Sequence, residues 1–281
     1  MGTTITDALT TTDEVAGLIG TEGVRLLEVD EDTEAYGRGH LSGALGVHWK
    51  NDLQDPVRRD FIGATAFGAL MDRLGIANDT PVVLYGGNNN WFAAYAYWYF
   101  RYYGHQAVRL MDGGRKKWEL EGRPMTTEVV YPSPRRGYRT DDPAERIRAR
   151  RHDVETVLAS GGASLVDVRS PEEYRGELLA PAHLPQEAAQ RGGHIPGARN
   201  IPWARAVDPE TGAFLTGDQL RSLYESNGIT PDTDVIAYCR IGERSAHTWF
   251  VLHELLGYPQ VRNYDGSWTE WGSLVGAPIE R

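Results

Sequence analysis

The single cysteine of the chain lies in the stretch Val235-Ile236-Ala237-Tyr238-Cys239-Arg240-Ile241-Gly242-Glu243-Arg244-Ser245. Four apolar residues lead into Cys239, and a second apolar run extends from Ala246 to Leu256. A short apolar run, a polar loop and a longer apolar segment are typical of a buried strand, a tight loop and a helix. Functional groups of open parallel sheets lie at the carboxyl ends of the strands. We therefore expect Cys239 at such an end.

The surroundings of Cys239 predict a reactive thiolate. The loop would direct backbone N–H groups and the positive end of the following helix towards the sulfur. Arg240 and Arg244 add positive charge, and positive surroundings lower the pKa of a thiol. The alternative is that Cys239 is a small buried apolar residue. The strand, loop and helix pattern favours a nucleophile.

Bulk composition excludes several classes of protein. The chain has 281 residues and a formal net charge of −10, which argues against nucleic-acid binding. No apolar stretch approaches the roughly 18 residues of a membrane span. The start of the chain, Met1 to Thr12, is polar and carries no Lys or Arg, so it does not resemble a signal peptide. A single cysteine cannot form an internal disulfide, so we expect a cytoplasmic protein without partners in the membrane.

The chain contains two copies of one sequence pattern. The matched pairs include Gly75-Ile76 with Gly228-Ile229, Val82-Val83 with Val235-Ile236, Tyr85 with Tyr238, Asp112-Gly113 with Asp265-Gly266, His40 with His194 and Trp49 with Trp203. Two copies at this long period favour two tandem domains over a solenoid. The position that matches Cys239 is Gly86, so the first copy lacks the thiol. We expect the second copy to carry the chemistry.

The domain boundaries and fold class follow from the same pattern. We predict a first domain over residues 1–125, a linker over 126–142 that is rich in Pro and Arg, and a catalytic domain over 143–281. In the second half, strands are expected over 164–168, 234–238 and 260–263, and helices over 153–160, 216–226, 245–256 and 267–273. Alternating strands and helices predict an α/β fold in which each domain is a parallel sheet covered by helices on both faces.

These residues resemble the rhodanese family of sulfurtransferases, in its tandem type with an inactive first domain and an active second one. The markers are Val166-Asp167-Val168-Arg169, Gly193-His194-Ile195-Pro196-Gly197-Ala198, the loop from Cys239 to Arg244, and Tyr264-Asp265-Gly266-Ser267-Trp268. The resemblance covers nearly the whole chain. It implies a two-step transfer in which Cys239 takes a sulfur atom from a donor as a persulfide and passes it to a nucleophilic acceptor.

The resemblance also implies which residues bind the donor. They are Arg240, Ile241, Gly242, Glu243, Arg244 and Ser245. Two positions depart from the pattern of many relatives, which have Lys in place of Ile241 and Arg in place of Glu173. Arg175 or Arg191 is expected to replace the missing arginine.

The donor is expected to be thiosulfate, a dianion, because Arg240 and Arg244 outweigh Glu243. The sequence is similar to actinobacterial thiosulfate sulfurtransferases. The alternatives are 3-mercaptopyruvate as donor, or a persulfide carrier that serves a protein partner. A phosphatase is disfavoured, because the loop between Cys239 and Arg244 is shorter than a phosphate-binding loop. The acceptor would be cyanide, a thiol or a thiol protein, and no organic cofactor or metal is expected.

Overall fold

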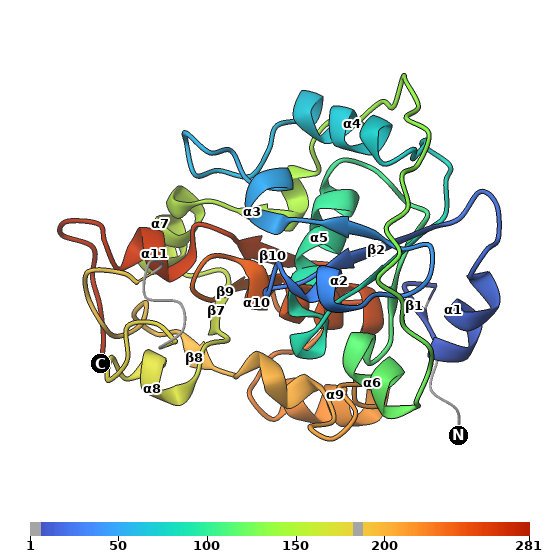
Figure 1. The fold of residues 1–281 in the computed structure, drawn as a ribbon. Helices are drawn as coiled ribbons and strands as arrows, with labels where there is room; N and C mark the ends of the chain where they lie inside the picture. The colour runs from blue at the N-terminus through green and yellow to red at the C-terminus, as the bar shows by residue number, and fades with distance from the viewer. Residues whose placement is uncertain (1–6, 182–187) are drawn as a thin grey trace. The chain divides into compact units, whose positions relative to one another are not determined.

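The computed structural model describes residues 7–181 and 188–281, which form two compact units (Figure 1). The first domain contains residues 7–144 together with 207–214, and the second domain contains the described residues of 145–206 and 215–281. The predicted linker, 126–142, therefore belongs to the first unit. So does the short segment 207–214, although it comes from the second half of the sequence.

The first domain is built on a five-stranded sheet. Its strands are β1 (Leu9–Thr10), β2 (Arg25–Val29), β3 (Leu45–Val47), β4 (Val82–Tyr85) and β5 (Val108–Met111). Its helices are α1 (Thr12–Leu18), α2 (Ala35–Arg38), α3 (Trp49–Asp52), α4 (Ala64–Arg73), α5 (Trp91–Tyr102) and α6 (Gly114–Leu120), with a 3₁₀ turn over Asn88–Asn90.

The second domain repeats this plan. Its strands are β6 (Arg148–Ala149), β7 (Ser164–Asp167), β8 (Arg199–Asn200), β9 (Val235–Tyr238) and β10 (Val261–Tyr264). Its helices are α7 (Arg151–Ser160), α8 (Pro171–Tyr174), α9 (Gly217–Glu225), α10 (Glu243–Trp249) and α11 (Ser267–Trp271), with 3₁₀ turns over Glu145–Ile147 and Trp203–Ala206. A π-helical turn over Phe250–Leu255 continues α10.

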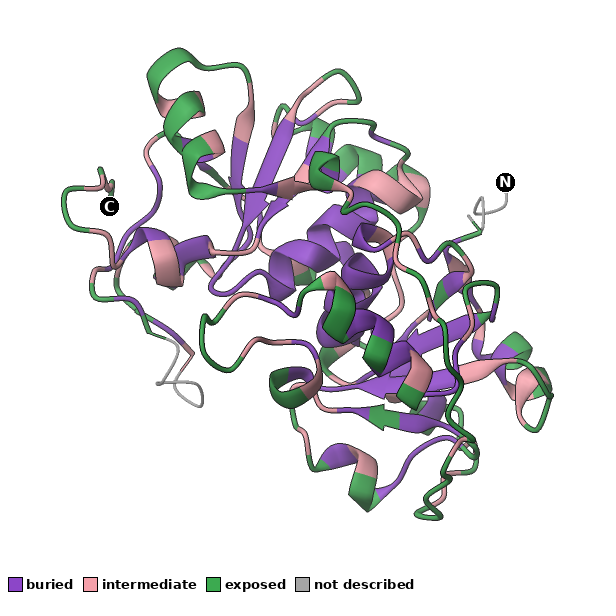
Figure 2. Cartoon of the chain, turned by 90° about the horizontal axis from the view of Figure 1, so that it is seen from above, coloured by how far each residue is buried: buried purple, intermediate pink, exposed green. Residues whose placement is uncertain are grey.

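Both sheets have the same strand order, β1-β5-β4-β2-β3 and β6-β10-β9-β7-β8, and all of their strand pairs are parallel. Helices flank each sheet, which confirms the predicted α/β fold of two similar domains. Strands buried on both faces read as continuous apolar runs. All four residues of β4 and of β9 are buried accordingly, and Figure 2 shows the sheet strands largely in the buried class.

The internal repeat is visible in single hydrogen bonds. Tyr85 ends β4, and its hydroxyl accepts a bond of 3.0 Å from the backbone N–H of Leu41. Tyr238 ends β9, and its hydroxyl accepts a bond of 3.0 Å from the backbone N–H of Ile195. The two tyrosines were matched from sequence alone, and they fasten the same loop in both domains.

The predicted elements of the second half are confirmed, with shifts of one or two residues at their ends. The capping box that opens α9 is present: Thr216 Oγ1 accepts a bond from the N–H of Gln219, and Gln219 Oε1 accepts one from the N–H of Thr216. A capping box satisfies two N–H groups that a helix start leaves free. Local signals of this kind explain why the helix starts were predictable.

The segment 126–142 is fastened to the end of α4. The Arg135 N–H donates to the carbonyl oxygen of Asp72, and the Gly137 and Tyr138 N–H groups donate to the Asp72 carboxylate at 3.2 and 3.0 Å. One aspartate thus anchors three residues of a segment that has no helix or strand of its own.

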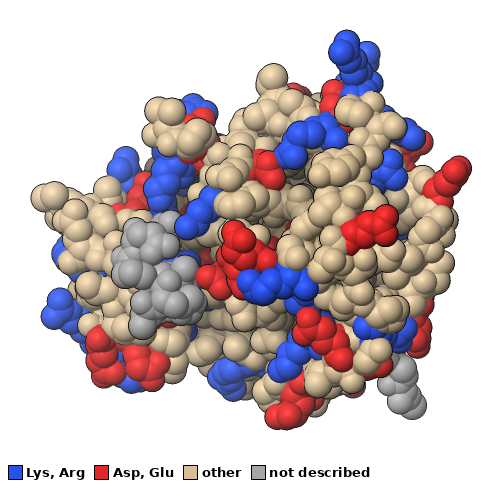
Figure 3. All heavy atoms as spheres, viewed as in Figure 1, with Lys and Arg blue, Asp and Glu red and all other residues tan. Residues whose placement is uncertain are grey.

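Charged groups of both signs are interspersed on the face drawn in Figure 3. Within the described ranges, no helix combines the length and the apolar character needed to cross a membrane. A nucleic-acid-binding face would need a basic patch, and the mixed charges of this face do not form one.

Candidate active site

Cys239 follows β9 directly, at the carboxyl end of the strand, and is completely buried. The chain turns through Arg240, Ile241 and Gly242 before α10 begins at Glu243. Gly242 has a φ of 98°, and a Cβ atom there would lie 2.7 Å from the Cα of Asp265. Only glycine fits such a turn without a shift of the backbone. The predicted strand, loop and helix are therefore present around the thiol.

The sulfur atom contacts a donor and an acceptor within the loop. The Gly242 N–H donates to Cys239 Sγ at 3.2 Å, and the thiol donates to Glu243 Oε2 at 3.1 Å. The Ile241 N–H also donates to Glu243 Oε2, at 3.2 Å. The loop N–H groups are thus shared between the sulfur and the carboxylate, whereas the sequence predicted that they gather around the sulfur.

Burial raises the pKa of the Cys239 thiol, and the Glu243 carboxylate raises this pKa further. The Arg244 charge and the Ser245 side chain lower the pKa, but they do not reverse the shift. The prediction of a resting thiolate is therefore wrong for this structure. The main cause is burial of the sulfur, which disfavours the charged thiolate, and the negative charge of Glu243 adds to the shift.

Arg240 is buried and carries free hydrogen-bond donors. Its Nη2 group donates to Glu243 Oε1 at 3.2 Å, which links it to the carboxylate beside the thiol. Within the part of the chain that the structure describes, its Nε and Nη1 groups have no hydrogen-bond partner. A buried guanidinium with open N–H groups is suited to bind an anion.

Arg244 is neutralised by a residue from α8. Its Nη1 and Nη2 groups donate to the two oxygens of Glu173 at 2.7 and 3.0 Å, a bidentate and buried pair. This pairing lowers the pKa of Glu173 despite its burial. Two arginines and two glutamates thus surround the loop, so Glu173 offsets the positive excess that the sequence predicted from Arg240, Arg244 and Glu243.

Ser245 and Ile241 shape the loop. The Ser245 hydroxyl donates to Asn263 Oδ1 at 2.7 Å, and Asn263 Nδ2 donates to the carbonyl oxygen of Gly242 at 3.0 Å. Ile241 is 3% exposed. The structure therefore brings together all of the predicted loop residues, from Cys239 to Ser245, at the end of β9.

The two predicted arginines outside the loop lie elsewhere. Arg175 is half exposed and pairs with Glu177 at 2.8 Å. Arg191 donates to the backbone oxygens of Gly272 at 3.2 Å and Ala277 at 3.0 Å. Arg175 thus lies in a surface ion pair, and Arg191 anchors the chain after α11.

Three residues at this site were not among the predicted site residues: Glu173, Asn263 and Ser267. Ser267 Oγ accepts a bond of 3.0 Å from the N–H of Cys239 and donates to the carbonyl oxygen of Tyr264. The motif Ser170-Pro171-Glu172-Glu173 has the spacing of a capping box, which the structure contains. That signal predicts a helix start, but it does not predict that Glu173 faces a loop 71 residues away.

The family model described as Rhodanese-like domain matches this chain twice, over residues 11–121 and 150–274. The chain therefore belongs to the rhodanese family, as two tandem domains. A protein of Mycolicibacterium smegmatis, provisionally named thiosulfate sulfurtransferase, is 57% identical over 274 residues, which cover 98% of each chain. The sulfur carrier protein TtuD of Thermus thermophilus is 57% identical over 284 residues, which cover 100% of this chain and 99% of the relative. The chain is thus a rhodanese-type sulfurtransferase.

Solved structures support the fold. One of them is the crystal structure of SseA from Escherichia coli, which was reported in a description of 3-mercaptopyruvate sulfotransferases. It aligns with a TM-score of 0.79 at 24% identity, and the alignment covers 92% of this chain and 98% of SseA. Wild-type EanB aligns with a TM-score of 0.83 at 23% identity and covers 98% of this chain and 69% of that one. At these identities the likeness shows a common fold.

Proposed function

We propose that the protein transfers the outer sulfur of thiosulfate to cyanide or another thiophilic acceptor through a persulfide on Cys239. The observation that carries this proposal is the buried chain of contacts from the thiol to Glu243 and from Glu243 to Arg240, whose remaining N–H groups are open. The provisional names of the actinobacterial relatives support the same donor.

The groups on the loop suit both half-reactions. The thiol proton passes to Glu243, which already accepts its hydrogen bond. The thiolate then attacks the outer sulfur of thiosulfate, the S–S bond of the donor breaks, and sulfite leaves with the bonding electron pair. The acceptor attacks the outer sulfur of the persulfide, and Cys239 leaves as a thiolate. The Gly242 N–H, which donates to Sγ, stabilises the negative sulfur in both steps.

A mass measurement tests the persulfide, because the chain has one cysteine. The protein is incubated with thiosulfate, and the intact mass is expected to rise by one sulfur atom and to return to its first value with cyanide. Cys239→Ser should show neither change. A mass gain that persists in Cys239→Ser, or wild-type turnover without any loaded species, would contradict the mechanism.

A rate comparison tests the donor. We expect faster thiocyanate formation from thiosulfate than from 3-mercaptopyruvate, and a raised KM for thiosulfate in Arg240→Gln. Arg175→Gln is the matched control, since it removes an exposed arginine that is already paired. Faster thiocyanate formation from 3-mercaptopyruvate would be compatible with the persulfide mechanism and would refute thiosulfate as the preferred donor.

A carrier role is the second candidate, and the likeness to TtuD favours it. In that role the persulfide on Cys239 would pass to a thiol of a protein partner rather than to a small acceptor. Fast loading by thiosulfate together with slow turnover by cyanide is the result that would distinguish the carrier from the enzyme.

A further inference from the structure

The loop that begins with Cys239 and the loop that begins with Gly86 are each held by the same kind of backbone contact within their own domain. The Trp268 N–H donates to the carbonyl oxygen of Cys239 at 3.0 Å. The Arg115 N–H donates to the carbonyl oxygen of Gly86 at the same distance of 3.0 Å. Each donor is the second residue of a short helix, α11 in one domain and α6 in the other. The two loops can therefore be compared residue by residue.

The backbone N–H of the first loop residue has a different acceptor in the two domains. In the first domain, the Gly86 N–H donates to Asn90 Oδ1 at 2.9 Å. In the second domain, the Cys239 N–H donates to Ser267 Oγ at 3.0 Å, and the Ser267 hydroxyl donates to the carbonyl oxygen of Tyr264 at 2.6 Å. Both N–H groups are buried, so each of them requires an acceptor.

Asn90 and Glu243 occupy the same place in the two loops, four residues after the first one. The Asn90 side chain turns back to the start of its loop. The Glu243 carboxylate instead accepts hydrogen bonds from the thiol at 3.1 Å and from the Ile241 N–H at 3.2 Å. Because Ser267 bonds the Cys239 N–H, the side chain at position 243 is not needed there, and its carboxylate can contact the sulfur.

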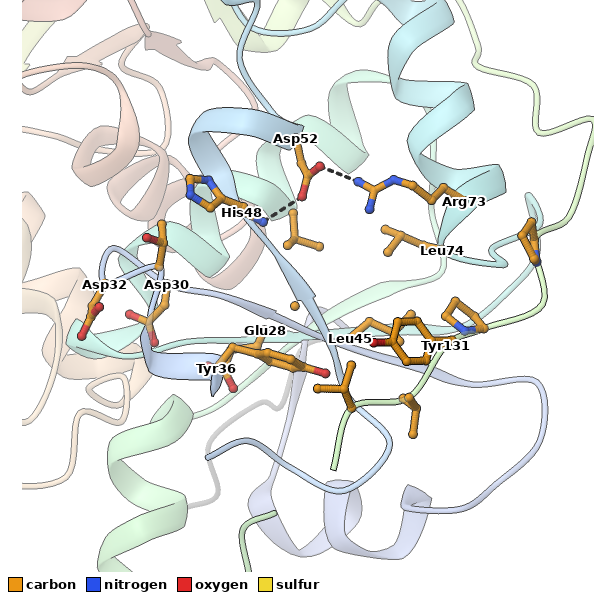
Figure 4. A pocket seen from close by; sticks show the side chains of 17 residues that line it. Glu28, Asp30, Asp32, Tyr36, Leu45, His48, Asp52, Arg73, Leu74 and Tyr131 are labelled. Carbon is orange, nitrogen blue, oxygen red and sulfur yellow. Dashed lines mark hydrogen bonds and ion pairs between the residues drawn. The ribbon is translucent and has the colours of Figure 1, made fainter. Parts of the chain in front are cut away.

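The loop of the first domain is bonded by side chains of that domain. The Gly87 N–H donates to Asp30 Oδ2 at 2.8 Å, and Figure 4 shows Asp30 at the wall of a cavity in the first domain. Gly114 matches Ser267 in the repeat, and a Cβ atom at Gly114 would lie 2.3 Å from Asn90 Oδ1. A serine at position 114 and the inward position of Asn90 therefore exclude each other.

Ser267 has a backbone conformation that serine rarely adopts. Its φ is 50°, in the left-handed region, and the residue is fully buried. Gly114, at the matching position, has a φ of 54°. Glycine adopts such values without steric cost, so the second domain retains a strained serine where the first domain has an unstrained residue. Strain of this kind persists where the surroundings hold it and is concentrated at functional sites.

We propose that Ser267 is a positioning residue for sulfur transfer, which bonds the Cys239 N–H and thereby keeps the Glu243 carboxylate on the thiol. Without the hydroxyl, this buried N–H would lack its acceptor, which is costly. The Glu243 side chain would then turn to the N–H, as Asn90 does in the first domain. The inference rests on the proposed function, in which Glu243 takes the thiol proton.

Ser267→Gly tests the proposal, because glycine removes the hydroxyl and also relieves the positive φ. The readout is the rate of alkylation of Cys239 by iodoacetamide against pH. It needs no sulfur donor, so its outcome is independent of the mass measurement with thiosulfate. Burial raises the pKa of the thiol and the Glu243 carboxylate raises it further, so departure of the carboxylate should move the profile about one pH unit or more to lower pH. A profile that coincides with the wild type, or moves to higher pH, would overturn the proposal.

A double-variant cycle separates this role from a general loosening of the loop. In a Glu243→Gln background the carboxylate is already absent, so Ser267→Gly should produce no further shift of the profile. Additive shifts would show that Ser267 acts on the thiol without Glu243 and would refute the proposal. The other charged groups near the thiol are the same in every variant: Arg240, Arg244 and Glu173.

Ser267→Ala is the second variant, because alanine removes the hydroxyl and retains the positive φ. It should shift the alkylation profile as Ser267→Gly does, with a lower midpoint of urea denaturation than Ser267→Gly. Ser160→Gly is the matched control: it makes the same change at an exposed serine of α7, whose hydroxyl donates to the carbonyl oxygen of Thr156, and should leave the profile unchanged. A wild-type profile in Ser267→Ala would also contradict the proposal.

Discussion

In the proposed mechanism, the contact between Cys239 and Glu243 governs the activation of the thiol. A carboxylate 3.1 Å from a buried sulfur opposes its ionisation and is at the same time the nearest acceptor for its proton. In the proposed mechanism, Glu243 thus helps burial to keep the thiol protonated at rest and also accepts the proton when a donor binds. Arg240 and Arg244 keep Glu243 ionised, because both lower its pKa.

Glu243→Gln should lower the pKa of Cys239, since it removes a negative charge that raises this pKa. In the wild type the thiolate fraction should grow only at alkaline pH, and in the variant the profile should move to lower pH. The rate of alkylation of the single cysteine by iodoacetamide, measured against pH, reports the pKa of Cys239 in the wild type and in the variant.

Glu177→Gln is the matched control, because the exposed Glu177 side chain accepts its hydrogen bonds from Arg175 and lies outside the loop. It should leave the alkylation profile unchanged. A profile of Glu243→Gln that coincides with the wild type, or moves to higher pH, would show that Glu243 does not govern the thiol.

Arg191→Met should lower stability and leave the KM for thiosulfate unchanged. Arg191 satisfies the backbone oxygens of Gly272, Leu274 and Ala277, and leaving such acceptors without partners costs about 1–3 kcal/mol. Urea denaturation measures the loss. Arg175→Met, at an exposed ion pair, should change stability by less than about 0.5 kcal/mol. A raised KM with native stability would instead support donor binding by Arg191.

At the scale of elements, both domains contain the same strand, loop and helix, but the loop begins with a thiol in the second domain and with a glycine in the first. Cys239 begins the loop after β9, whereas Gly86 begins the loop after β4. A Cβ atom at Gly86 would lie 2.2 Å from the carbonyl oxygen of Val29, so this loop has no room for any side chain there. Asn90 fastens it through bonds to Gly86 N–H and the Met111 oxygen. A cysteine at position 86 would therefore require a shift of the backbone.

Gly86→Ala should destabilise the first domain by about 1–3 kcal/mol, the usual cost of overpacking a buried site. Thermal unfolding or urea denaturation measures it. Gly17→Ala is the control: nothing lies within 4 Å of a Cβ at this exposed position in α1, and alanine favours helices over glycine. A Gly86→Ala protein as stable as the wild type would mean that the loop adjusts its backbone freely.

At the scale of the whole molecule, the two domains hold their buried carboxylates in opposite ways. Ion pairs and hydrogen bonds lower the pKa of Glu173 and Glu243 in the second domain. Burial raises the pKa of Glu28 and Asp30 in the first. A carboxylate whose pKa is lowered by folding stabilises the fold at pH values above its ordinary pKa, and this stabilisation is lost as the pH falls. A carboxylate whose pKa is raised by folding contributes stability at low pH, and this stabilisation is lost as the pH rises.

Acidification from neutral pH to below 4.5, the ordinary value for glutamate, should therefore weaken the second domain before the first. Hydrogen exchange followed by mass spectrometry measures the protection of peptides from each domain at each pH. Earlier loss of protection in the first domain would contradict the assignment of these buried groups.

The α/β fold, the two tandem domains and the place of Cys239 after a buried strand could all be predicted from the sequence. These features depend on apolar periodicity, capping signals and internal repetition, all of which act over short stretches or by comparison along the chain. Which charged groups meet depends on the tertiary structure. Glu173 reaches Arg244 from 71 residues away and cancels its charge, and burial with Glu243 raises the pKa of the thiol. Electrostatics in a protein interior depends on burial and on distances between remote residues, which spacing along the chain does not contain.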